Sequence, residues 1–332
     1  MELTNKNYYQ TKLLSTSSVK LFAQNPARAL ADFTGQYPWS DDLITFPLNL
    51  AFHDMVEQAI KYTCNKEIIE NASKNLKDDS WIPKVLDFAE KNASKNVIKE
   101  MLETDKYSEL RTTKGRLIPK VEKIAVWFHI LWNSDIMKNV GIQAMLSTQN
   151  KDIDIITEKP LVGVYKLDNQ KIKYKGKPNL VVVNCKQKLI EVFDYKLSLP
   201  FDPSGYDWGK DITGKRQYMP IEWMVKKLFP WQAGVYRQLL LDNGYKDYQI
   251  RYRFLVITKE ETPRLNVFSI SKESMDEGYS QFKYYLILAH GYVSGELKDP
   301  PLIQDGSKFA NMQSYKHPLN FVSQPFYNKK SN

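Results

Sequence analysis

The stretch Leu189-Ile190-Glu191-Val192-Phe193-Asp194-Tyr195-Lys196 is the most informative in this chain. Its apolar residues predict a strand suited to burial. Alternate side chains of a strand share a face, so Asp194 and Lys196 point the same way and Tyr195 points the opposite way. Burying an unpaired charge costs roughly several kcal/mol. The two charges therefore form a plain ion pair, or they belong to a metal-dependent hydrolytic site.

Composition limits the protein class. The chain has 332 residues, of which 42% are hydrophobic and 13% aromatic, so global disorder is excluded. There are 47 Lys+Arg against 38 Asp+Glu, and the formal net charge of +9 favours a polyanionic partner such as nucleic acid. Two distant cysteines, Cys64 and Cys185, exclude a four-cysteine metal site within the chain and are typical of a reducing compartment. With no apolar run of membrane-spanning length and no apolar signal core, we expect a soluble cytoplasmic protein without a membrane partner.

Helical patterns dominate roughly the first 136 residues. Ser15-Thr16-Ser17-Ser18 offers several N-caps for a helix that Pro26 interrupts, and a second short helix is expected at 27–33. Further helical patterns occur at 48–63, 66–103 and 121–132.

After about residue 137 the pattern changes to short strands. These are expected at 141–146, 152–157, 161–167, 180–184 and 189–196. Later elements are a long loop at 199–222, a helix at 231–242, a hairpin at 248–257 and 264–270, and a helix at 272–290. The simplest organisation is one domain over 1–295, with a helical part to about 136, a core over 137–295 and a tail over 296–332.

Four polar motifs follow one another in a particular order. They are His53-x-x-x-Glu57, Gly176-Lys177-Pro178-Asn179, Asp194-Tyr195-Lys196 and Gln232-Ala233-Gly234-Val235-Tyr236. The first and last are i,i+4 pairs, so each places two polar side chains on one face of a helix. The second opens one strand, and the third ends the next strand.

In this order the motifs resemble the PD-(D/E)XK nuclease superfamily, and within it the RecB-like group that includes the RecE-type phage exonucleases. The resemblance spans about 15–257, and Gln-x-x-x-Tyr after Asp-x-Lys is its most discriminating signature. It implies an α/β fold with a mixed central β-sheet flanked by helices, a restriction-endonuclease-like core. It also implies Mg²⁺- or Mn²⁺-dependent hydrolysis of DNA, in recombination, repair or phage DNA processing in a bacterial or phage-infected cell.

The resemblance also assigns roles around the ion. His53, Asp194 and the backbone carbonyl of Tyr195 match metal ligands. The position after Gly176-Lys177-Pro178 matches a further metal-binding aspartate, but this chain has Asn179 there. Asparagine keeps one carbonyl acceptor and loses the negative charge, so we expect weaker ion binding and weaker activation of water.

The remaining residues of the motifs match groups that act on the substrate. Lys196 matches the catalytic lysine. Gln232 and Tyr236 match a helix pair that contacts the site and the DNA backbone, and Glu57 matches an acidic residue near the ion. A purely structural role is the alternative for three of them. Gln232 and Tyr236 could serve helix packing, and Glu57 could lie on a solvated helix face.

The asparagine leaves three explanations open. An active nuclease carries an inactivating substitution at Asn179, or the protein is a degenerate nuclease that retains DNA binding, or a nearby acid substitutes. Glu191 faces away from Asp194 on alternation, so Glu158 is the better placed acid. We expect a metal-dependent DNA exonuclease and favour the inactivating substitution as the explanation of Asn179. The alternative is a non-catalytic DNA-binding or assembly protein on the same fold. A homo-oligomer or a recombination partner protein stays open.

Overall fold

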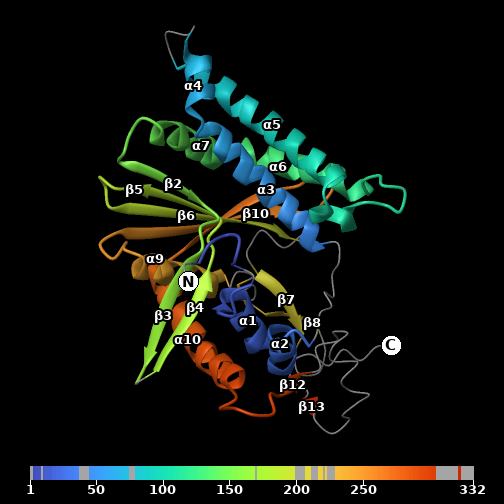
Figure 1. The fold of residues 1–332 in the computed structure, drawn as a ribbon, viewed down its shortest axis with the longest axis vertical. Coiled ribbons are helices and arrows are strands. Elements are labelled where there is room, and N and C mark those ends of the chain that lie inside the picture. The colour runs from blue at the N-terminus through green and yellow to red at the C-terminus, as the bar shows by residue number, and fades with distance from the viewer. Residues whose placement is uncertain are drawn as a thin grey trace.

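The chain is built around a mixed five-stranded sheet with helices on both faces (Figure 1). The computed structural model describes residues 3–8, 10–36, 45–74, 79–168, 170–198, 206–210, 216–219, 221–222, 229–303 and 321–322. The sheet has the order β11-β10-β6-β5-β2. Its strands are β2 (Ile153–Thr157), β5 (Leu180–Asn184), β6 (Leu189–Ser198), β10 (Gln249–Thr258) and β11 (Leu265–Ile270). The expected α/β class, a mixed central sheet flanked by helices, is confirmed.

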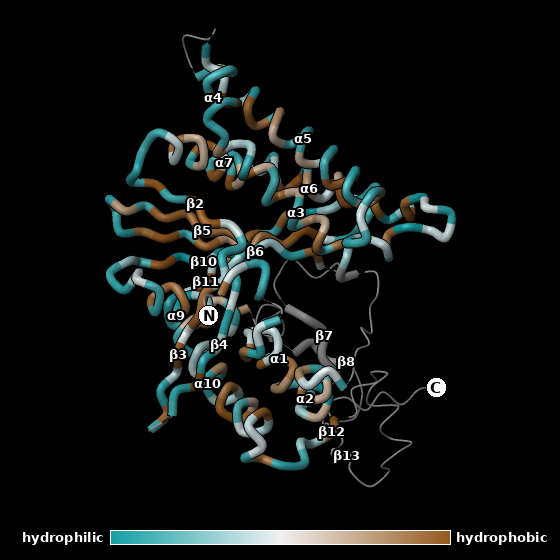
Figure 2. Tube along the Cα trace, in the orientation of Figure 1, coloured by the Kyte–Doolittle hydropathy of each residue, from teal (hydrophilic) through white to brown (hydrophobic). Residues whose placement is uncertain are grey.

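The middle strands are hydrophobic on both faces, which explains their central position. In Figure 2 they form continuous hydrophobic segments. β5 reads Leu-Val-Val-Val-Asn, and its first four residues are buried. It pairs antiparallel with β2 on one side and β6 on the other. β6 and β10 are parallel, so the chain must cross over between them, and α9 (Phe229–Asp242) lies in that connection.

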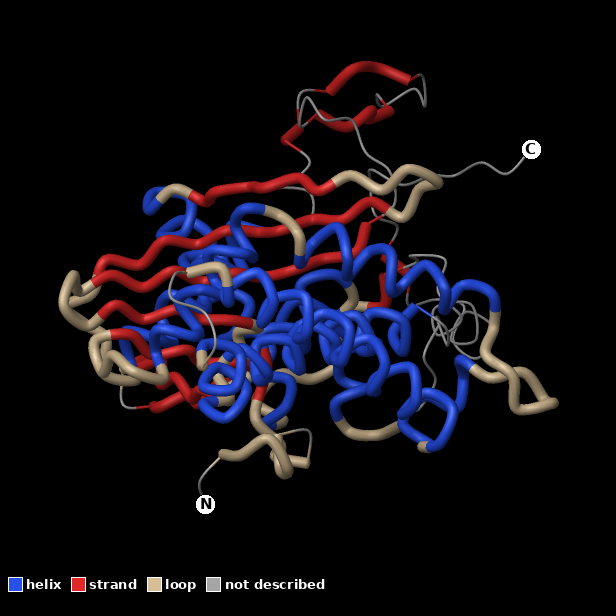
Figure 3. Tube along the Cα trace, turned by 90° about the horizontal axis from the view of Figure 1, so that it is seen from above, coloured by secondary structure: helices blue, strands red, loops and turns tan. Residues whose placement is uncertain are grey.

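Helices from the first half of the chain cover one face of the sheet. They are α3 (Thr45–Thr63), α4 (Lys66–Ser73), α5 (Trp81–Glu103), α6 (Glu122–Trp132) and α7 (Asp135–Ser147), with short 3₁₀ turns at Asp105–Leu110 and Pro119–Val121. Their apolar side chains share one core with Leu180, Phe193 and Tyr195 of the sheet. In Figure 3 these helices lie across strands that run side by side.

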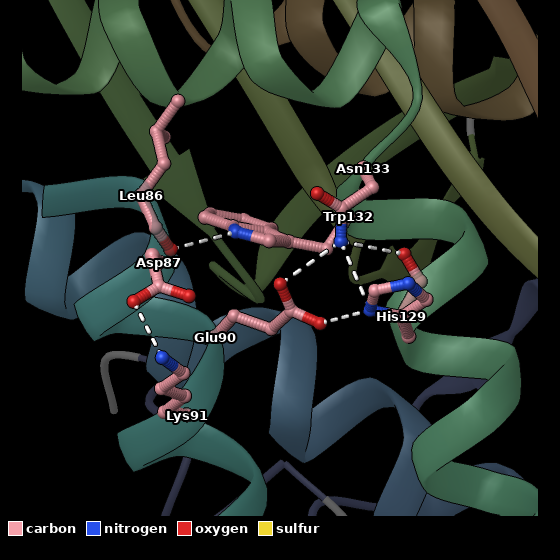
Figure 4. A network of polar contacts seen from close by, with 7 residues as sticks. All are labelled: Leu86, Asp87, Glu90, Lys91, His129, Trp132 and Asn133. Carbon is pink, nitrogen blue, oxygen red and sulfur yellow. Dashed lines mark hydrogen bonds and ion pairs between the residues drawn. The ribbon is translucent and has the colours of Figure 1, made fainter. Parts of the chain in front are cut away.

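The contact between α5 and α6 combines an apolar interior with a polar rim (Figure 4). Trp132 is buried and its indole N–H donates to the Leu86 carbonyl at 3.1 Å. At the rim, Glu90 accepts from Asn133 at 2.9 Å and pairs with His129 at 2.5 Å. The aromatic residues of α6 are therefore part of the core.

The opposite face of the sheet packs against α9 and α10 (Lys272–Ser294), with α1 (Thr16–Gln24) and α2 (Pro26–Phe33) alongside. A second sheet, in the order β1-β4-β3, lies on this side; its strands are β1 (Leu14–Ser15), β3 (Leu161–Leu167) and β4 (Gln170–Gly176). Ser15 caps α1 through a capping box with Ser18, as the serine-rich start predicts.

Three sequence-based expectations differ from the structure, and one is that no strand was expected at 170–176, where β4 lies. The strand expected at 141–146 is wrong, because these residues belong to α7. Ser134 caps that helix by accepting from the Met137 N–H, and apolar residues recur at helical spacing along it. The loop expected at 199–222 contains short strands, β7 (Tyr206–Lys210), β8 (Arg216–Met219) and β9 (Ile221–Glu222), and the rest of it lies outside the described residues.

The remaining elements follow the predicted order. The helix at 231–242, the 248–257 and 264–270 hairpin and the last long helix appear as α9, β10 with β11, and α10. A short parallel pair, β12 (Leu302–Ile303) with β13 (Phe321–Val322), follows. No helix in the described ranges has the length and hydrophobicity needed to cross a membrane.

Candidate active site

Three polar residues lie side by side at one end of the central sheet because of strand register. Leu180 of β5 is opposite Phe193 of β6, and it is also opposite Thr157 of β2. Continuing each register by one residue places Asn179 beside Asp194 and Glu158 beside Asn179. A hydrogen bond from the Glu158 N–H to the Asn179 carbonyl, at 3.0 Å, extends the β2–β5 ladder to this point. Directly opposed residues on paired strands share a face, so the register places Asn179 between Glu158 and Asp194 at this end of the sheet.

Asp194 is fully buried, and groups from three elements hold its carboxylate. Lys196 Nζ lies 2.7 Å from Oδ1. Gln232 Nε2, from α9, donates to Oδ2 at 2.5 Å, and the Tyr252 hydroxyl, from β10, donates to the same oxygen at 3.0 Å. The buried charge is thus compensated by one cation and two neutral donors, as such burial requires.

Asn179 links the sheet to α3. Its Nδ2 donates to Glu158 Oε1 at 2.7 Å and lies 3.1 Å from His53 Nδ1. These two contacts are made by Nδ2 and leave Asn179 Oδ1 buried, without a hydrogen-bond partner among the described residues. A buried carbonyl oxygen in this condition is destabilising unless another group, such as a water or a cation, satisfies it.

Glu158 is held as a carboxylate by several neighbours. Lys177 Nζ lies 2.7 Å from Oε2, and His53 Nδ1 lies 3.8 Å from Oε1. Burial raises the pKa of Glu158, but the imidazole, the Lys177 ammonium and the Asn179 amide outweigh it and lower the pKa to about 2. The residue adopts a positive φ of 48°, which ends the alternation of β2. Glu191, the other acid considered, instead pairs with Arg253 at 2.9 Å.

Tyrosines line both sides of the strand end. The Tyr195 ring lies on the α3 side, 4.9 Å from the His53 ring. Tyr236, one turn after Gln232, lies 6.3 Å from Tyr252, ring to ring. Burial raises the pKa of all three phenols well above the ordinary value, so they stay neutral.

Glu57 takes a different direction from the other predicted residues. It forms an ion pair with Lys61 at 2.8 Å, one turn along α3. Within the described residues it makes no hydrogen bond or ion pair with Asp194, Asn179 or Lys196.

The donor set fits a hydrated magnesium or manganese ion. Asn179 Oδ1 is unsatisfied, and Asp194 Oδ1 has the Lys196 ammonium beside it but no hydrogen bond in the described residues. Mg²⁺ prefers oxygen ligands, and one or two carboxylates with several waters are enough to bind it. No group of three or more His, Cys, Asp and Glu side chains, within the part of the chain that is described, forms a metal cage. The site therefore suits an ion that keeps most of its waters, with Asp194, Asn179 and Glu158 as its candidate oxygen donors.

Sequence reasoning missed two members of this cluster. Tyr252 lies in an ordinary strand pattern, and only the parallel register of β6 with β10 brings it to Asp194. Lys177 belongs to the Gly176-Lys177-Pro178-Asn179 motif, but that motif does not predict its ion pair with Glu158. The sequence offers one signal for this lysine, which is that it lies two residues before Asn179, close to the predicted site.

Comparison with known proteins supports the fold. No protein-family description and no curated protein matches this chain. A solved structure from Eubacterium rectale, described as a "Putative exonuclease", has a TM-score of 0.54 at 15% identity and covers 90% of this chain and 89% of its own. A structure named SSO0001 has 14% identity over 60% of this chain and 71% of its own, and its TM-score of 0.24 carries no argument. The first likeness shows that the α/β fold is shared over nearly the whole length.

Proposed function

We propose that this protein is a metal-dependent DNA nuclease, an exonuclease of recombination, repair or phage DNA processing. The observation that carries the proposal is the environment of the buried Asp194. Lys196 of the same strand and Gln232 of the distant helix α9 contact its carboxylate, and Asn179 lies next in register on β5. The exonuclease description of the structural neighbour and the basic net charge of +9 support it.

Each residue has a chemical task in phosphodiester hydrolysis. Gln232 and Tyr252 hold Asp194 Oδ2, which leaves Oδ1 for the ion and for Lys196. The Lys196 ammonium stabilises negative charge that develops on the phosphate oxygens. A bound Mg²⁺ or Mn²⁺ would supply polarisation of the phosphate and a lower pKa for the attacking water.

The asparagine at position 179 should limit how tightly this protein binds the metal ion. A neutral amide contributes no charge to cation binding, and among the acids of the described ranges only Glu158 is seen to contact it. In an Asn179→Asp variant, a second carboxylate would stand at hydrogen-bond distance from that of Glu158. Two carboxylates so close repel each other unless a cation or a shared proton lies between them. We therefore expect the aspartate form to bind Mg²⁺ more tightly than the present form.

The test compares the present protein, Asn179→Asp, and Asn179→Asp with Lys196→Met. Linear labelled DNA is incubated with each protein in Mg²⁺, in Mn²⁺ and in EDTA. We expect Asn179→Asp to cleave at least about 100-fold faster than the present protein, a difference of about 2.7 kcal/mol in the barrier, and the added Lys196→Met to remove the gain. Closed circular DNA tests the exonuclease assignment, since an exonuclease requires an end.

A readout independent of cleavage accompanies this test. Mg²⁺ should raise the melting temperature of Asn179→Asp more than that of the present protein, because the ion binds the folded state of the variant more tightly. If neither cleavage nor the Mg²⁺-dependent stabilisation increases in Asn179→Asp, the nuclease proposal fails.

The alternative is a non-catalytic DNA-binding protein on the same fold. One observation favours it: Nδ2 of Asn179 donates to Glu158 and lies beside His53, an arrangement that an amide satisfies and a carboxylate does not. This alternative predicts salt-sensitive DNA binding in the present protein and no cleavage after the change to aspartate. A homo-oligomer or a recombination partner would be sought by size measurement with and without DNA.

A further inference from the structure

The β3–β4 hairpin carries a row of lysines on one face. Residues 161–177 contain five lysines and one acid, Asp168, which is a formal charge of +4. On β4 the lysines occur at every second position, and alternate residues of a strand share a face. The cross-strand register pairs Lys166 with Lys171 and Val164 with Lys173, so these lysines share one face. Figure 1 shows the hairpin extending away from the central sheet.

The two faces of the hairpin have different environments. Tyr174 and Ile172, on the inner face, are buried, and the Tyr174 ring lies 5.2 Å from that of Phe282 in α10. On the outer face Lys166, Lys171 and Lys173 are exposed. None of the three forms an ion pair or hydrogen bond within the described residues. Three like charges held side by side repel one another, so this face is suited to an anionic partner.

The row continues toward the candidate active site. Lys175 is buried, and its ammonium donates to the carbonyls of Tyr8 and Thr11 in the N-terminal segment. That segment therefore crosses the row at this point, and the exposed Lys12 lies next to the contact. Lys177, two residues further, pairs with Glu158 in the cluster around Asn179. Lys171 and Lys177 are separated by six residues, about 20 Å of extended chain.

We propose that Lys166, Lys171 and Lys173, with Lys12, form a track that holds the phosphate backbone of a nucleic-acid strand and leads it to the Asp194 site. Lysines two residues apart on a strand recur about every 6.7 Å, so the row presents a line of positive charges along which a phosphate backbone can lie. Such contacts neutralise the backbone without reading bases, so the track is independent of sequence. The inference rests on the proposed nuclease function for the destination of the strand, and the binding step is measurable without it.

The test removes the charge of the track and of a matched surface. The track variant is Lys166→Gln, Lys171→Gln and Lys173→Gln together. The control variant is Lys84→Gln, Lys95→Gln and Lys123→Gln together, three exposed lysines of α5 and α6 that also lack ion pairs among the described residues. Both variants lower the formal charge from +9 to +6, so they differ only in where the charge is lost.

Binding to a labelled 30-nucleotide single strand is measured in EDTA over a range of salt concentrations, so that no cleavage occurs. We expect the track variant to lose about 10- to 100-fold in affinity at about 0.1 M salt, with a salt slope shallower by about 2. The control should change by less than about threefold, and replacing the same track lysines by arginine should retain binding. An equal loss in both glutamine variants, or no loss in the track variant, overturns the inference.

A second measurement separates this inference from the nuclease proposal. In the Asn179→Asp background, removal of the track should raise KM for DNA about 10-fold or more and leave kcat within about twofold, because the track lysines lie outside the reacting groups. If the track variant loses DNA binding and the Asn179→Asp protein does not cleave DNA, the nuclease function is rejected and the track is supported. Cleavage that is unaffected by loss of the track rejects the track alone.

Discussion

Asp194 shows how a single carboxylate organises this molecule. Its oxygens contact a lysine of its own strand, a glutamine of α9 and a tyrosine of β10. A buried carboxylate is stabilised by such partners, so three elements are tied together where they meet. The same contacts keep a negative charge at a fixed place, which metal-assisted hydrolysis requires.

The Lys196 ammonium should contribute to stability as well as to the proposed chemistry. In Lys196→Met the carboxylate of Asp194, whose side chain is 1% exposed, keeps the neutral donors Gln232 and Tyr252 as its partners among the described residues. We expect a loss of about 2–4 kcal/mol in the free energy of unfolding, measured with urea, because an uncompensated buried charge remains. Adding Asp194→Asn should recover most of that loss, since neither partner is then charged. A single variant as stable as the parent would contradict this account.

Glu158 should make stability depend on pH. Its pKa in the folded protein, about 2, is below the ordinary value of 4.5 expected in the unfolded chain. The unfolded state therefore binds a proton first, and the stabilisation is complete above about pH 4.5 and is lost as the pH falls toward 2. A shift of this size corresponds to about 3 kcal/mol. The stability difference between the parent and Glu158→Gln, measured at pH 6 and at pH 3, should shrink at the lower pH. A difference that does not change with pH would show that the contribution of Glu158 is not ionic.

At the scale of elements, period and turn signals predicted most of the strands and helices. The β10–β11 hairpin follows from alternation and the intervening turn, and Ser15 marks the start of α1, whereas no strand was expected where β4 lies. The i,i+4 motifs correctly placed polar groups on α3 and α9. The strand expected at 141–146 is wrong because a short apolar run fits the spacing of a strand and that of a helix equally well. The N-cap at Ser134 is the local signal that indicates a helix here.

Contacts that join distant elements were harder to predict. The parallel pairing of β6 with β10 involves residues about 60 positions apart, so no local pattern identifies Tyr252 as a partner of Asp194. Glu57 shows that a local match can also mislead. Its i,i+4 spacing from His53 places it on the same helix face, but its carboxylate pairs with Lys61. The motifs contain Asp194, Lys196 and Gln232, which the structure brings into contact, whereas the contacts of Tyr252 and Lys177 required the structure.

The α9–α10 crossing depends on two glycines. A Cβ on Gly234 would lie 2.2 Å from the Met275 carbonyl oxygen, and one on Gly278 would lie 2.3 Å from the Pro230 carbonyl carbon. Alanine in a helix is normally about 1 kcal/mol better than glycine, but here the added methyl meets backbone that cannot move away. We expect Gly234→Ala to destabilise the protein by about 1–3 kcal/mol in urea unfolding.

Gly141 in α7 provides a control for this prediction. A Cβ there would meet the end of the Leu86 side chain at 2.5 Å, and a side-chain end can rotate away. Gly141→Ala should therefore cost less than Gly234→Ala. An equal or greater cost would mean that the α9–α10 crossing is not the tighter contact. Because Gln232 lies two residues before Gly234, the crossing also sets where that glutamine meets Asp194.

At the scale of the whole molecule, one sheet separates two hydrophobic cores. Phe193 and Tyr195 face the core under α3, and Val192 faces the core under α9. Asp194 is exceptional because it occupies an inward position on the α9 side where an apolar residue would otherwise lie. The site is thus built into the central layer, and both helical layers are needed to position it.

This arrangement predicts that the core of the chain does not fold without its helical first part. A fragment of residues 149–303 would expose Leu180, Phe193, Tyr195, Leu255 and Ile257, which α3 and its neighbours otherwise cover. A large exposed apolar sheet face promotes aggregation. We expect the fragment to elute as aggregates in size-exclusion chromatography and to bind a hydrophobic dye, whereas the full chain does neither. Co-expression with residues 1–148 should restore a soluble complex, because the missing layer is returned. A fragment that is monomeric and retains a native-like circular dichroism spectrum would show that the α9 side of the sheet is sufficient for folding.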